Sequence, residues 1–289
     1  MNMPKLVLIV GIPGSGKTTY AKSYIKQYSG VHLSSDFIRK ELYGDESIQG
    51  SPNEVFALMQ KRTVEALNDG RSVVYDATNV TRKDRAGIIA ACPKFVQIEA
   101  HVVWAPIKTC IERDAARERT VGKTVIDRML KRFQPPFHDE GIDEIKIVYP
   151  NDFSSMEYCR KVMGAINIPH DNPHHTLGIK EHCQEAFLNA CDMRISSEFE
   201  QAAMWHDIGK SYVKAFVDGK GNPCEAAHYY SHHNVGSWMV YGMPNITPFI
   251  AWLIGTHMDP FLNTKYYNNL PSFLKSYVDS LHTCDLNAH

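Results

Sequence analysis

The chain has 289 residues and a formal net charge of −1, with 44% hydrophobic and 22% charged residues. This composition is ordinary for a globular protein. The near-zero net charge excludes a non-specific nucleic-acid binder, which would be strongly basic. The length predicts two domains. Residues 1–150 hold 22 Lys and Arg, 18 Asp and Glu and 3 His, whereas residues 151–289 hold 9, 14 and 11. We therefore expect two domains with different ligands, phosphates in the first and metal cations in the second.

Cysteine usage and hydropathy indicate a cytoplasmic protein. The seven cysteines form no C-x-x-C pair, which favours free thiols in a reducing compartment. Neither a signal peptide nor an apolar run of 18 residues is found, so no contact with a membrane is expected. The oligomeric state stays open, with a homodimer as one option.

Short apolar runs alternate with amphipathic stretches through residues 1–150. The predicted strands are 5–10, 31–33, 72–76 and 95–103, and the predicted helices are 18–27, 35–43, 53–69, 81–91 and 106–117. This alternation predicts an α/β fold with a parallel sheet flanked by helices. Ligands of such sheets bind at the carboxyl ends of the strands.

Residues 11–18, Gly-Ile-Pro-Gly-Ser-Gly-Lys-Thr, match the phosphate-binding loop G-x-x-x-x-G-K-[ST] in full. Glycines let the backbone approach an anion, and N–H groups at the start of the following helix face it. We expect the Lys17 ammonium at the β- and γ-phosphates of ATP or another NTP, and the Thr18 hydroxyl at Mg²⁺. The predicted nucleotide-binding residues of the loop are Gly11, Pro13, Gly14, Ser15, Gly16, Lys17, Thr18 and Thr19.

Two carboxylates follow strands of the predicted sheet. Asp36 comes after the strand at 31–33, and Arg39 lies three residues on, on the same helical face. A carboxylate that accepts a hydroxyl proton, beside a guanidinium that holds a phosphate, makes a phosphate-acceptor site. Helix capping is the alternative for Asp36. Asp76 ends the strand 72–76 and is expected to orient Mg²⁺ or its waters, a simple strand-end turn being the alternative.

Arg113 and Arg117 lie four residues apart on the helix predicted at 106–117, so they face one way. Basic residues after the fourth strand can form a lid that neutralises charge in phosphoryl transfer. Arg113 is accordingly added to the nucleotide-binding set. A solvated helix face is the simpler alternative.

Residues 3–150 resemble the kinase domain of polynucleotide 5′-kinases. The motifs that carry the resemblance are G-x-P-G-S-G-K-T, Asp36-x-x-Arg39, Asp76-Ala-Thr-Asn79 and Cys110-x-x-Arg113-x-x-x-Arg117. The resemblance implies that Lys17 and Arg117 contact the ATP phosphates, that Asp36 is the general base for a 5′-hydroxyl, and that Arg39 holds the acceptor's phosphate. The D-x-D-G-T motif of the phage enzymes' phosphatase is missing from this sequence, so something else follows the kinase.

The second half reads as mostly helical, with amphipathic segments at 176–193, 198–206, 233–241, 246–257 and 271–287. Its histidines and aspartates include His182, the adjacent pair His206-Asp207, His232, His257 and Asp285. Imidazoles with carboxylates suit divalent ions such as Mn²⁺, Fe²⁺, Co²⁺, Ni²⁺ or Zn²⁺. A single buried histidine is more often a core residue, but eleven in this half favour a metal site.

The pattern H…HD…D, with His-Asp-Ile-Gly-Lys at 206–210, resembles the HD-domain phosphohydrolases over residues 172–289. The resemblance implies the metal ligands His182, His206, Asp207 and Asp285, with Asp207 also helping to activate water, and a second-ion or phosphate role for His232 and His257. The rivals are His175 for the first ligand, and His228 and His233 for His232.

The predicted organisation is a P-loop kinase domain (1–150), a linker (151–171) and an all-α HD domain (172–289). Enzymes that pair these two domains form a known family, and the pairing implies a nucleic-acid end-healing enzyme whose substrates are RNA or DNA ends. It would phosphorylate 5′-hydroxyl ends with ATP and Mg²⁺ and remove 2′-, 3′- or 2′,3′-cyclic phosphates. The alternatives are a small-metabolite or nucleoside kinase fused to an HD nucleotidase, and a nucleotide sensor with a regulatory HD domain.

Overall fold

The computed structural model describes residues 3–28, 30–173 and 176–288. The chain divides into two compact units: unit 1 comprises residues 1–129 and 136–151, and unit 2 comprises residues 130–135 and 152–289. The range predicted as a linker, 151–171, contains a helix, α7 (Ser155–Ala165). Within the described part of the chain, no helix is both long and apolar enough to cross a membrane.

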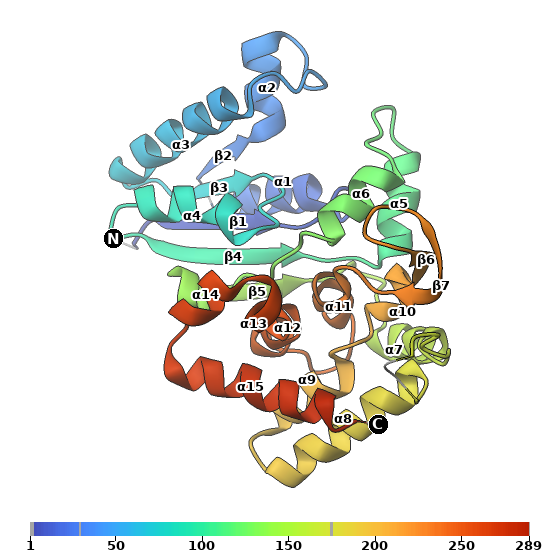
Figure 1. The fold of residues 1–289 in the computed structure, drawn as a ribbon. Helices are drawn as coiled ribbons and strands as arrows, with labels where there is room; N and C mark the ends of the chain where they lie inside the picture. The colour runs from blue at the N-terminus through green and yellow to red at the C-terminus, as the bar shows by residue number, and fades with distance from the viewer. Residues whose placement is uncertain (1–2, 29, 174–175, 289) are drawn as a thin grey trace. The chain divides into compact units, whose positions relative to one another are not determined.

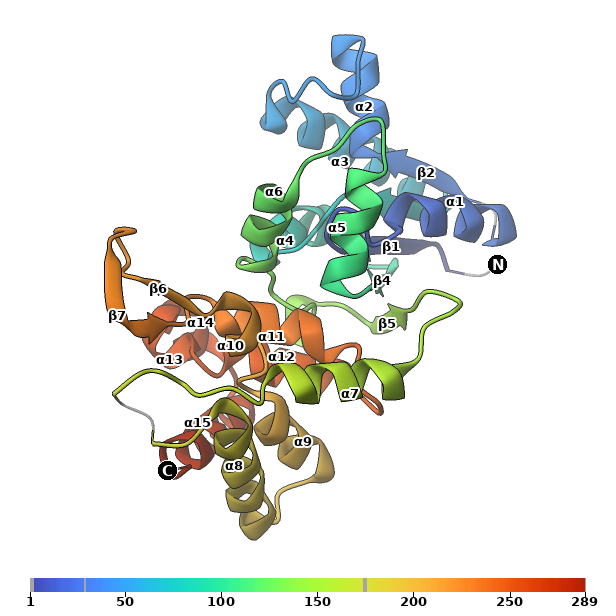
Figure 2. The ribbon, with the colours of Figure 1, turned by 90° about the vertical axis from the view of Figure 1, so that its right-hand side faces the viewer.

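Unit 1 has a five-stranded parallel sheet in the order β2-β3-β1-β4-β5. Helices α1 and α4 cover opposite faces of this sheet (Figures 1 and 2). The predicted parallel sheet flanked by helices is thus confirmed. Its elements are β1 (Lys5–Val10), α1 (Lys17–Tyr28), β2 (Val31–Ser34), α2 (Ser35–Tyr43), α3 (Pro52–Asn68), β3 (Val73–Asp76), α4 (Arg82–Ala91), β4 (Gln97–Val103), α5 (Ile107–Ala115), α6 (Lys123–Leu130), the 3₁₀ turn η1 (His138–Glu140) and β5 (Glu144–Val148).

Local sequence sets the ends of the helices around the sheet. The Ser34 hydroxyl caps α2 by accepting the Asp36 N–H, and Gly44 ends that helix in the left-handed conformation with φ 81°. Thr81 and Asp84 form a capping box at the start of α4, each side chain accepting the other's backbone N–H. These caps start α2 and α4 close behind strands β2 and β3, at the carboxyl edge of the sheet.

The region after β4 departs from the sequence prediction. The helix predicted at 106–117 ends at Ala115, because the buried Asp114 carboxylate accepts the N–H groups of Val121 and Gly122 and turns the chain. Helix α6 and the edge strand β5 were not predicted. The β5 sequence Glu-Ile-Lys-Ile-Val alternates charged and apolar residues, as a half-buried edge strand does.

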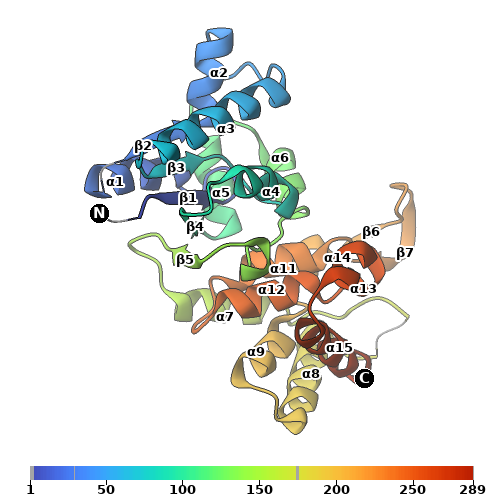
Figure 3. The same cartoon turned by 90° about the vertical axis from the view of Figure 1, so that its left-hand side faces the viewer.

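Unit 2 is mainly helical, but it also contains an antiparallel hairpin, β6–β7, so the expectation of an all-α fold does not hold in full (Figure 3). Its core includes the fully buried rings of Phe133, Phe199, Trp238 and Trp252. Its elements are α7, α8 (Ile179–Met193), α9 (Ser197–Trp205), α10 (Lys210–Val213), β6 (Ala215–Val217), β7 (Pro223–His228), α11 (His232–Val240), α12 (Pro248–Thr256), α13 (Asp259–Leu262), α14 (Thr264–Asn269) and α15 (Ser272–Leu286).

Candidate functional site

The phosphate-binding loop of unit 1 joins β1 to α1, and a close backbone contact requires glycine at position 14. Gly14 has φ 79°, and a Cβ there would lie 2.1 Å from the carbonyl oxygen of Cys110. The Lys17 ammonium donates to the Ile12 carbonyl at 2.8 Å, which folds the side chain back over the loop. Burial lowers the pKa of Lys17 to about 8, against the opposing attraction of the Asp76 carboxylate. Thr18 and Thr19 are exposed at the start of α1.

Asp76 lies beside the loop, because β3 pairs with β1 so that Asp76 stands opposite Ile9. The carboxylate is 3% exposed, and His32 Nε2 lies 3.1 Å from its Oδ2. The turn that follows is tied to β1 by Asn79, which has φ 47° and donates its side-chain amide to the Ile9 carbonyl at 2.7 Å. The Asp-Ala-Thr-Asn segment therefore holds a buried carboxylate next to the phosphate-binding loop.

A buried ion pair also holds this turn in place. Arg85 is fully buried and makes two parallel bonds to Glu140, at 2.7 and 2.8 Å. A third nitrogen of the same guanidinium donates to the Asn79 carbonyl at 2.8 Å. The sequence analysis did not identify this pair, because its partners are 55 residues apart.

Asp36 and Arg39 meet on α2, as their spacing predicts. Arg39 Nη1 donates to Asp36 Oδ1 at 2.8 Å, while 46% of the Asp36 side chain stays open to solvent. An arginine that the sequence analysis missed also faces this carboxylate: Arg119 Nη1 lies 3.8 Å from Asp36 Oδ1 and 3.8 Å from a Glu46 carboxylate oxygen. Asp36 is thus an accessible base flanked by two guanidinium groups.

The predicted lid arginines differ in their surroundings from Arg119. Arg113 and Arg117 are both exposed, the first on α5 and the second just beyond its end. Arg117 is near enough to Lys17 to lower the pKa of that ammonium further, alongside the larger effect of burial. The stretch from 116 to 122, which carries Arg117 and Arg119, is held by the Asp114 carboxylate described above.

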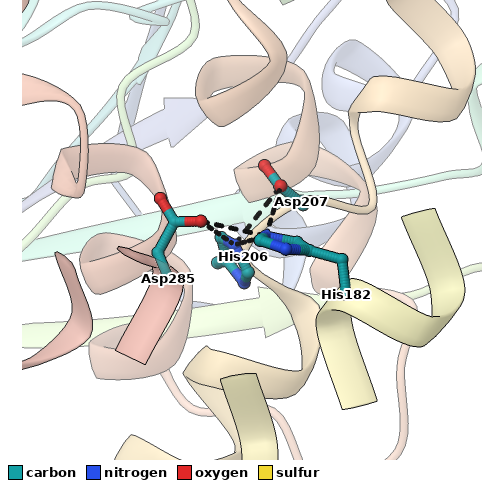
Figure 4. Close-up of side chains that lie close together, drawn as sticks. All are labelled: His182, His206, Asp207 and Asp285. Atoms are coloured by element: carbon teal, nitrogen blue, oxygen red, sulfur yellow. Dashed lines mark hydrogen bonds and ion pairs between the residues drawn. The ribbon is translucent and has the colours of Figure 1, made fainter. Parts of the chain in front are cut away.

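In unit 2 the four predicted metal ligands lie together (Figure 4). Asp285 Oδ1 is 2.9 Å from His182 Nε2 and 3.3 Å from His206 Nε2, and Asp207 Oδ2 is 3.3 Å from both imidazole nitrogens. Two ligand atoms that each lie about 2.1 Å from one ion are about 3.0–3.4 Å apart at octahedral or tetrahedral angles. The observed separations therefore fit one divalent cation.

The hydrogen bonds of these imidazoles leave Nε2 as the available nitrogen. Nδ1 of His182 lies 2.8 Å from the Ala288 carbonyl, and Nδ1 of His206 lies 2.8 Å from the Ala203 carbonyl. A carbonyl only accepts, so Nδ1 carries a proton in both rings, and the two Nε2 atoms, 3.3 Å apart, face the carboxylates and the position of a metal ion. Nδ1–H bonded to a carbonyl is the usual support of a metal-binding histidine.

A second set shares the Asp207 carboxylate. His232 Nε2 lies 3.2 Å from Asp207 Oδ1 and 3.2 Å from His257 Nε2, and these three residues form a further group that could hold a metal ion. Both rings again donate Nδ1 to a backbone carbonyl, of Tyr229 for His232 and of Ile254 for His257. Asp207 can therefore bridge two cations through its two oxygens.

The groups around Asp207 favour its ionised form. Burial alone would raise the pKa of Asp207, but Lys210 and His206 hold it well below its ordinary value. Burial also opposes charge on His206, yet Asp207 and Asp285 outweigh it and raise the pKa of His206 well above the usual range. At His257 burial prevails and lowers the pKa to about 3. The first set thus attracts positive charge, whereas His257 stays neutral and able to bind a metal.

The rival histidines of the sequence analysis lie elsewhere. His228 is on β7 and stacks on Tyr230, with ring centroids 5.3 Å apart. His233 is buried on α11 with its ring edge against His232 and His257, outside both ligand sets. His175 lies outside the described residues.

Two further residues at this centre were not identified from the sequence. The Lys210 ammonium is 2.6 Å from Asp207 Oδ2, and His170 Nε2 is 3.3 Å from the same ammonium. Lys210 stands in the His-Asp-Ile-Gly-Lys segment, three residues after Asp207, and that spacing on a helical turn was an available signal. His170 comes from the range predicted as linker, and nothing local in the sequence links it to the centre.

The family match falls in the first half of the chain. Residues 6–136 match the family described as AAA domain. An Arabidopsis thaliana protein named transcription factor bHLH140 is 25% identical over 153 residues, which are 50% of this chain and 16% of that protein. The L-seryl-tRNA(Sec) kinase of Methanococcus maripaludis is 29% identical over 146 residues, which are 45% of this chain and 53% of that protein. The chain therefore spans about a sixth of the length of the first relative and about half of the length of the second.

Solved structures give similarities of the same extent. A chain of the Pnkp1/Rnl/Hen1 RNA repair complex is 23% identical with a TM-score of 0.41, covering 46% of this chain and 44% of that one. A fungal RNA kinase is 14% identical with a TM-score of 0.39, covering 57% and 44%. A gluconokinase from Sinorhizobium meliloti 1021 is 16% identical with a TM-score of 0.38, covering 53% and 86%. Unit 1, with its phosphate-binding loop, parallel sheet and family match, is thus a kinase-like P-loop domain.

Proposed function

We propose that the chain is a bifunctional nucleic-acid end-healing enzyme. Unit 1 transfers the γ-phosphate of ATP to a 5′-hydroxyl end of RNA or DNA, and unit 2 removes a 2′-, 3′- or 2′,3′-cyclic phosphate. The observation that carries the proposal is the presence in one chain of two separate centres. One has a phosphate-donor loop with an accessible carboxylate beside a guanidinium, and the other has paired imidazole and carboxylate groups.

In unit 1 one set of residues binds the phosphate donor and another binds the acceptor. The loop amides and Lys17 bind the β- and γ-phosphates, while Thr18 and Asp76 would hold Mg²⁺ and its waters. Asp36 accepts the proton of the 5′-hydroxyl while the hydroxyl oxygen bonds to the γ-phosphorus. The bond from that phosphorus to the bridging oxygen breaks, and ADP leaves. Arg39 holds the acceptor's phosphate, and Arg113 and Arg117 offset the charge that develops on the donor.

In unit 2, His182, His206, Asp207 and Asp285 would hold one divalent transition-metal ion, and Asp207, His232 and His257 a second. Such ions would lower the pKa of water and polarise a phosphoryl oxygen. The backbone carbonyls fix the four rings with Nε2 inward, and Asp207 spans both positions. The donor set of imidazole and carboxylate fits Mn²⁺, Fe²⁺, Co²⁺, Ni²⁺ or Zn²⁺.

One RNA tests both activities. An oligonucleotide with a 5′-hydroxyl and a 2′,3′-cyclic phosphate should gain label from γ-labelled ATP and lose its terminal phosphate. Label transfer should disappear in Lys17→Ala and in Asp36→Ala and persist in Asp207→Ala, while phosphate release should show the opposite pattern. If a free nucleoside or sugar takes the label and no oligonucleotide does, the chain is a metabolite or nucleoside kinase instead.

The charge balance favours the metabolite or nucleoside kinase, because neither the full chain nor unit 1 has a strong excess of basic residues. The named activity of the Methanococcus maripaludis relative, on seryl-tRNA(Sec), supports an RNA-linked acceptor. A regulatory centre is a third alternative. It would be favoured if the purified protein contained no transition metal and hydrolysed no phosphoester.

A further inference from the structure

Arg119 is a charged side chain of unit 1 that the proposed phosphoryl transfer leaves without a role. It lies in the stretch from 116 to 122, whose backbone the Asp114 carboxylate holds. Its Nη1 lies 3.8 Å from Asp36 Oδ1 and 3.8 Å from Glu46 Oε1. The Arg119 guanidinium therefore stands beside the proposed general base and beside a carboxylate of the loop that follows α2.

Both contacts of Arg119 are longer than a hydrogen bond, which for N–H···O spans about 2.7–3.2 Å. The two carboxylates attract the guanidinium at 3.8 Å without accepting a hydrogen bond from this nitrogen, whereas Arg39 donates to Asp36 at 2.8 Å. An arginine has five N–H donors. Because 31% of the Arg119 side chain and 46% of the Asp36 side chain are exposed, a further anion can reach this guanidinium from solvent.

The position of Arg119 assigns it to the acceptor rather than to ATP. Arg117, two residues earlier, is near enough to Lys17 to affect the pKa of that ammonium, so it belongs to the donor side. Arg119 is instead beside Asp36, which receives the hydroxyl of the acceptor. The stretch from 116 to 122 thus offers one arginine to each substrate.

The chemistry of the acceptor supplies an anion for Arg119. In a polynucleotide the first phosphodiester is one sugar away from the 5′-hydroxyl. Asp36 loses its negative charge when it accepts the proton of that hydroxyl. Among the four side chains at this position, Arg39 and Arg119 then face Glu46 alone, and a phosphodiester supplies the second negative charge. The planar fork of a guanidinium matches two phosphate oxygens.

We propose that Arg119 binds the first phosphodiester of the acceptor, and that it thereby makes a nucleoside with a phosphate on its 3′-oxygen the substrate of unit 1 in preference to a free nucleoside or sugar. This inference rests on the 5′-kinase activity proposed for unit 1 and names its substrate class. Arg119 adds a second guanidinium to that of Arg39, so two cations hold the phosphate while Asp36 takes the proton.

Two oligonucleotide acceptors test the inference on the full chain. Both have a 5′-hydroxyl, and they differ only in the first linkage, which is a phosphodiester in one and an uncharged methylphosphonate in the other. Arg119→Ala should lower kcat/KM for the phosphodiester by about 10- to 100-fold, mainly through KM. It should leave kcat/KM for the methylphosphonate and KM for ATP at the wild-type values. Arg119→Lys keeps the charge without the planar fork and should recover part of the loss.

The Kd of each acceptor, measured by calorimetry with a non-hydrolysable ATP analogue, should change in the same pattern. Arg71→Ala is the matched control, because Arg71 is an exposed arginine of unit 1 that pairs with Asp69, and it should behave as wild type with both acceptors. Equal losses with both acceptors in Arg119→Ala would show an effect through the base or the fold, and a raised KM for ATP would assign Arg119 to the donor.

Either result would overturn the inference, and so would a wild type that uses the two acceptors equally well. These results leave the kinase activity itself intact. If the wild type phosphorylates neither oligonucleotide, the function proposed for unit 1 fails and this inference fails with it.

Discussion

Lys17 should take up a proton when ATP binds. Burial lowers its pKa to about 8. The phosphates of ATP place negative charge against the ammonium, which restores the charged form and raises the pKa toward or above its ordinary value. At pH 8 about half of the free chains carry a neutral Lys17, so binding should take up about 0.5 proton, and at pH 7 about 0.1 proton.

The same linkage fixes how affinity depends on pH. A lysine whose pKa is lowered in the free protein is already protonated below pH 8, so ATP affinity is constant there. Above pH 8 the proton must be supplied on binding, and the association constant should fall by about tenfold between pH 7 and pH 9. The opposite trend would follow if Lys17 were fully charged in the free protein and other groups lost protons on binding.

Calorimetry in two buffers of different ionisation enthalpy measures the proton uptake directly. The observed binding enthalpy at pH 8 should differ between HEPES and Tris in proportion to the protons taken up. Lys17→Arg is the matched control, because its guanidinium stays charged at every pH used. The reasoning is refuted if wild type takes up no proton at pH 8, or if Lys17→Arg takes up as many.

Three further outcomes are expected. Arg85→Met should lower the free energy of unfolding of unit 1 in urea by about 3–5 kcal/mol, because the Glu140 carboxylate is left buried and unpaired. Adding Glu140→Leu should recover most of that loss. Additive losses in the double variant would contradict this. Asp207→Ala should remove both metal equivalents from unit 2 by elemental analysis, whereas His257→Ala should remove one, and equal losses would disprove the bridging carboxylate. Gly14→Ala should abolish ATP binding, since its Cβ would meet a carbonyl oxygen at 2.1 Å in a left-handed conformation, and nucleotide titration at wild-type affinity would refute this.

Sequence reasoning succeeded in unit 1 where the chemistry is local. The phosphate-binding loop and the Asp36-Arg39 pair depend on residues a few positions apart, and the spacing on a helix brings the pair to 2.8 Å. The ion pair of Arg85 with Glu140 and the approach of Arg119 to Asp36 depend on tertiary folding instead. No periodicity in the sequence joins positions 55 or 83 residues apart.

The histidines of unit 2 show the same division within one centre. His206 and His257 cap the ends of α9 and α12, His232 begins α11, and each donates Nδ1 to the carbonyl three residues before it. That bond directs Nε2 away from the preceding backbone by local geometry alone, so an imidazole at such a helix boundary is oriented as a ligand before any metal binds. His182 lies within α8. Its ring is fixed by the Ala288 carbonyl, 106 residues away, so its orientation depends on the packing of α15 against α8. Of the four rings, His182 should therefore be the one whose Nε2 direction is lost first when the packing of α15 is weakened.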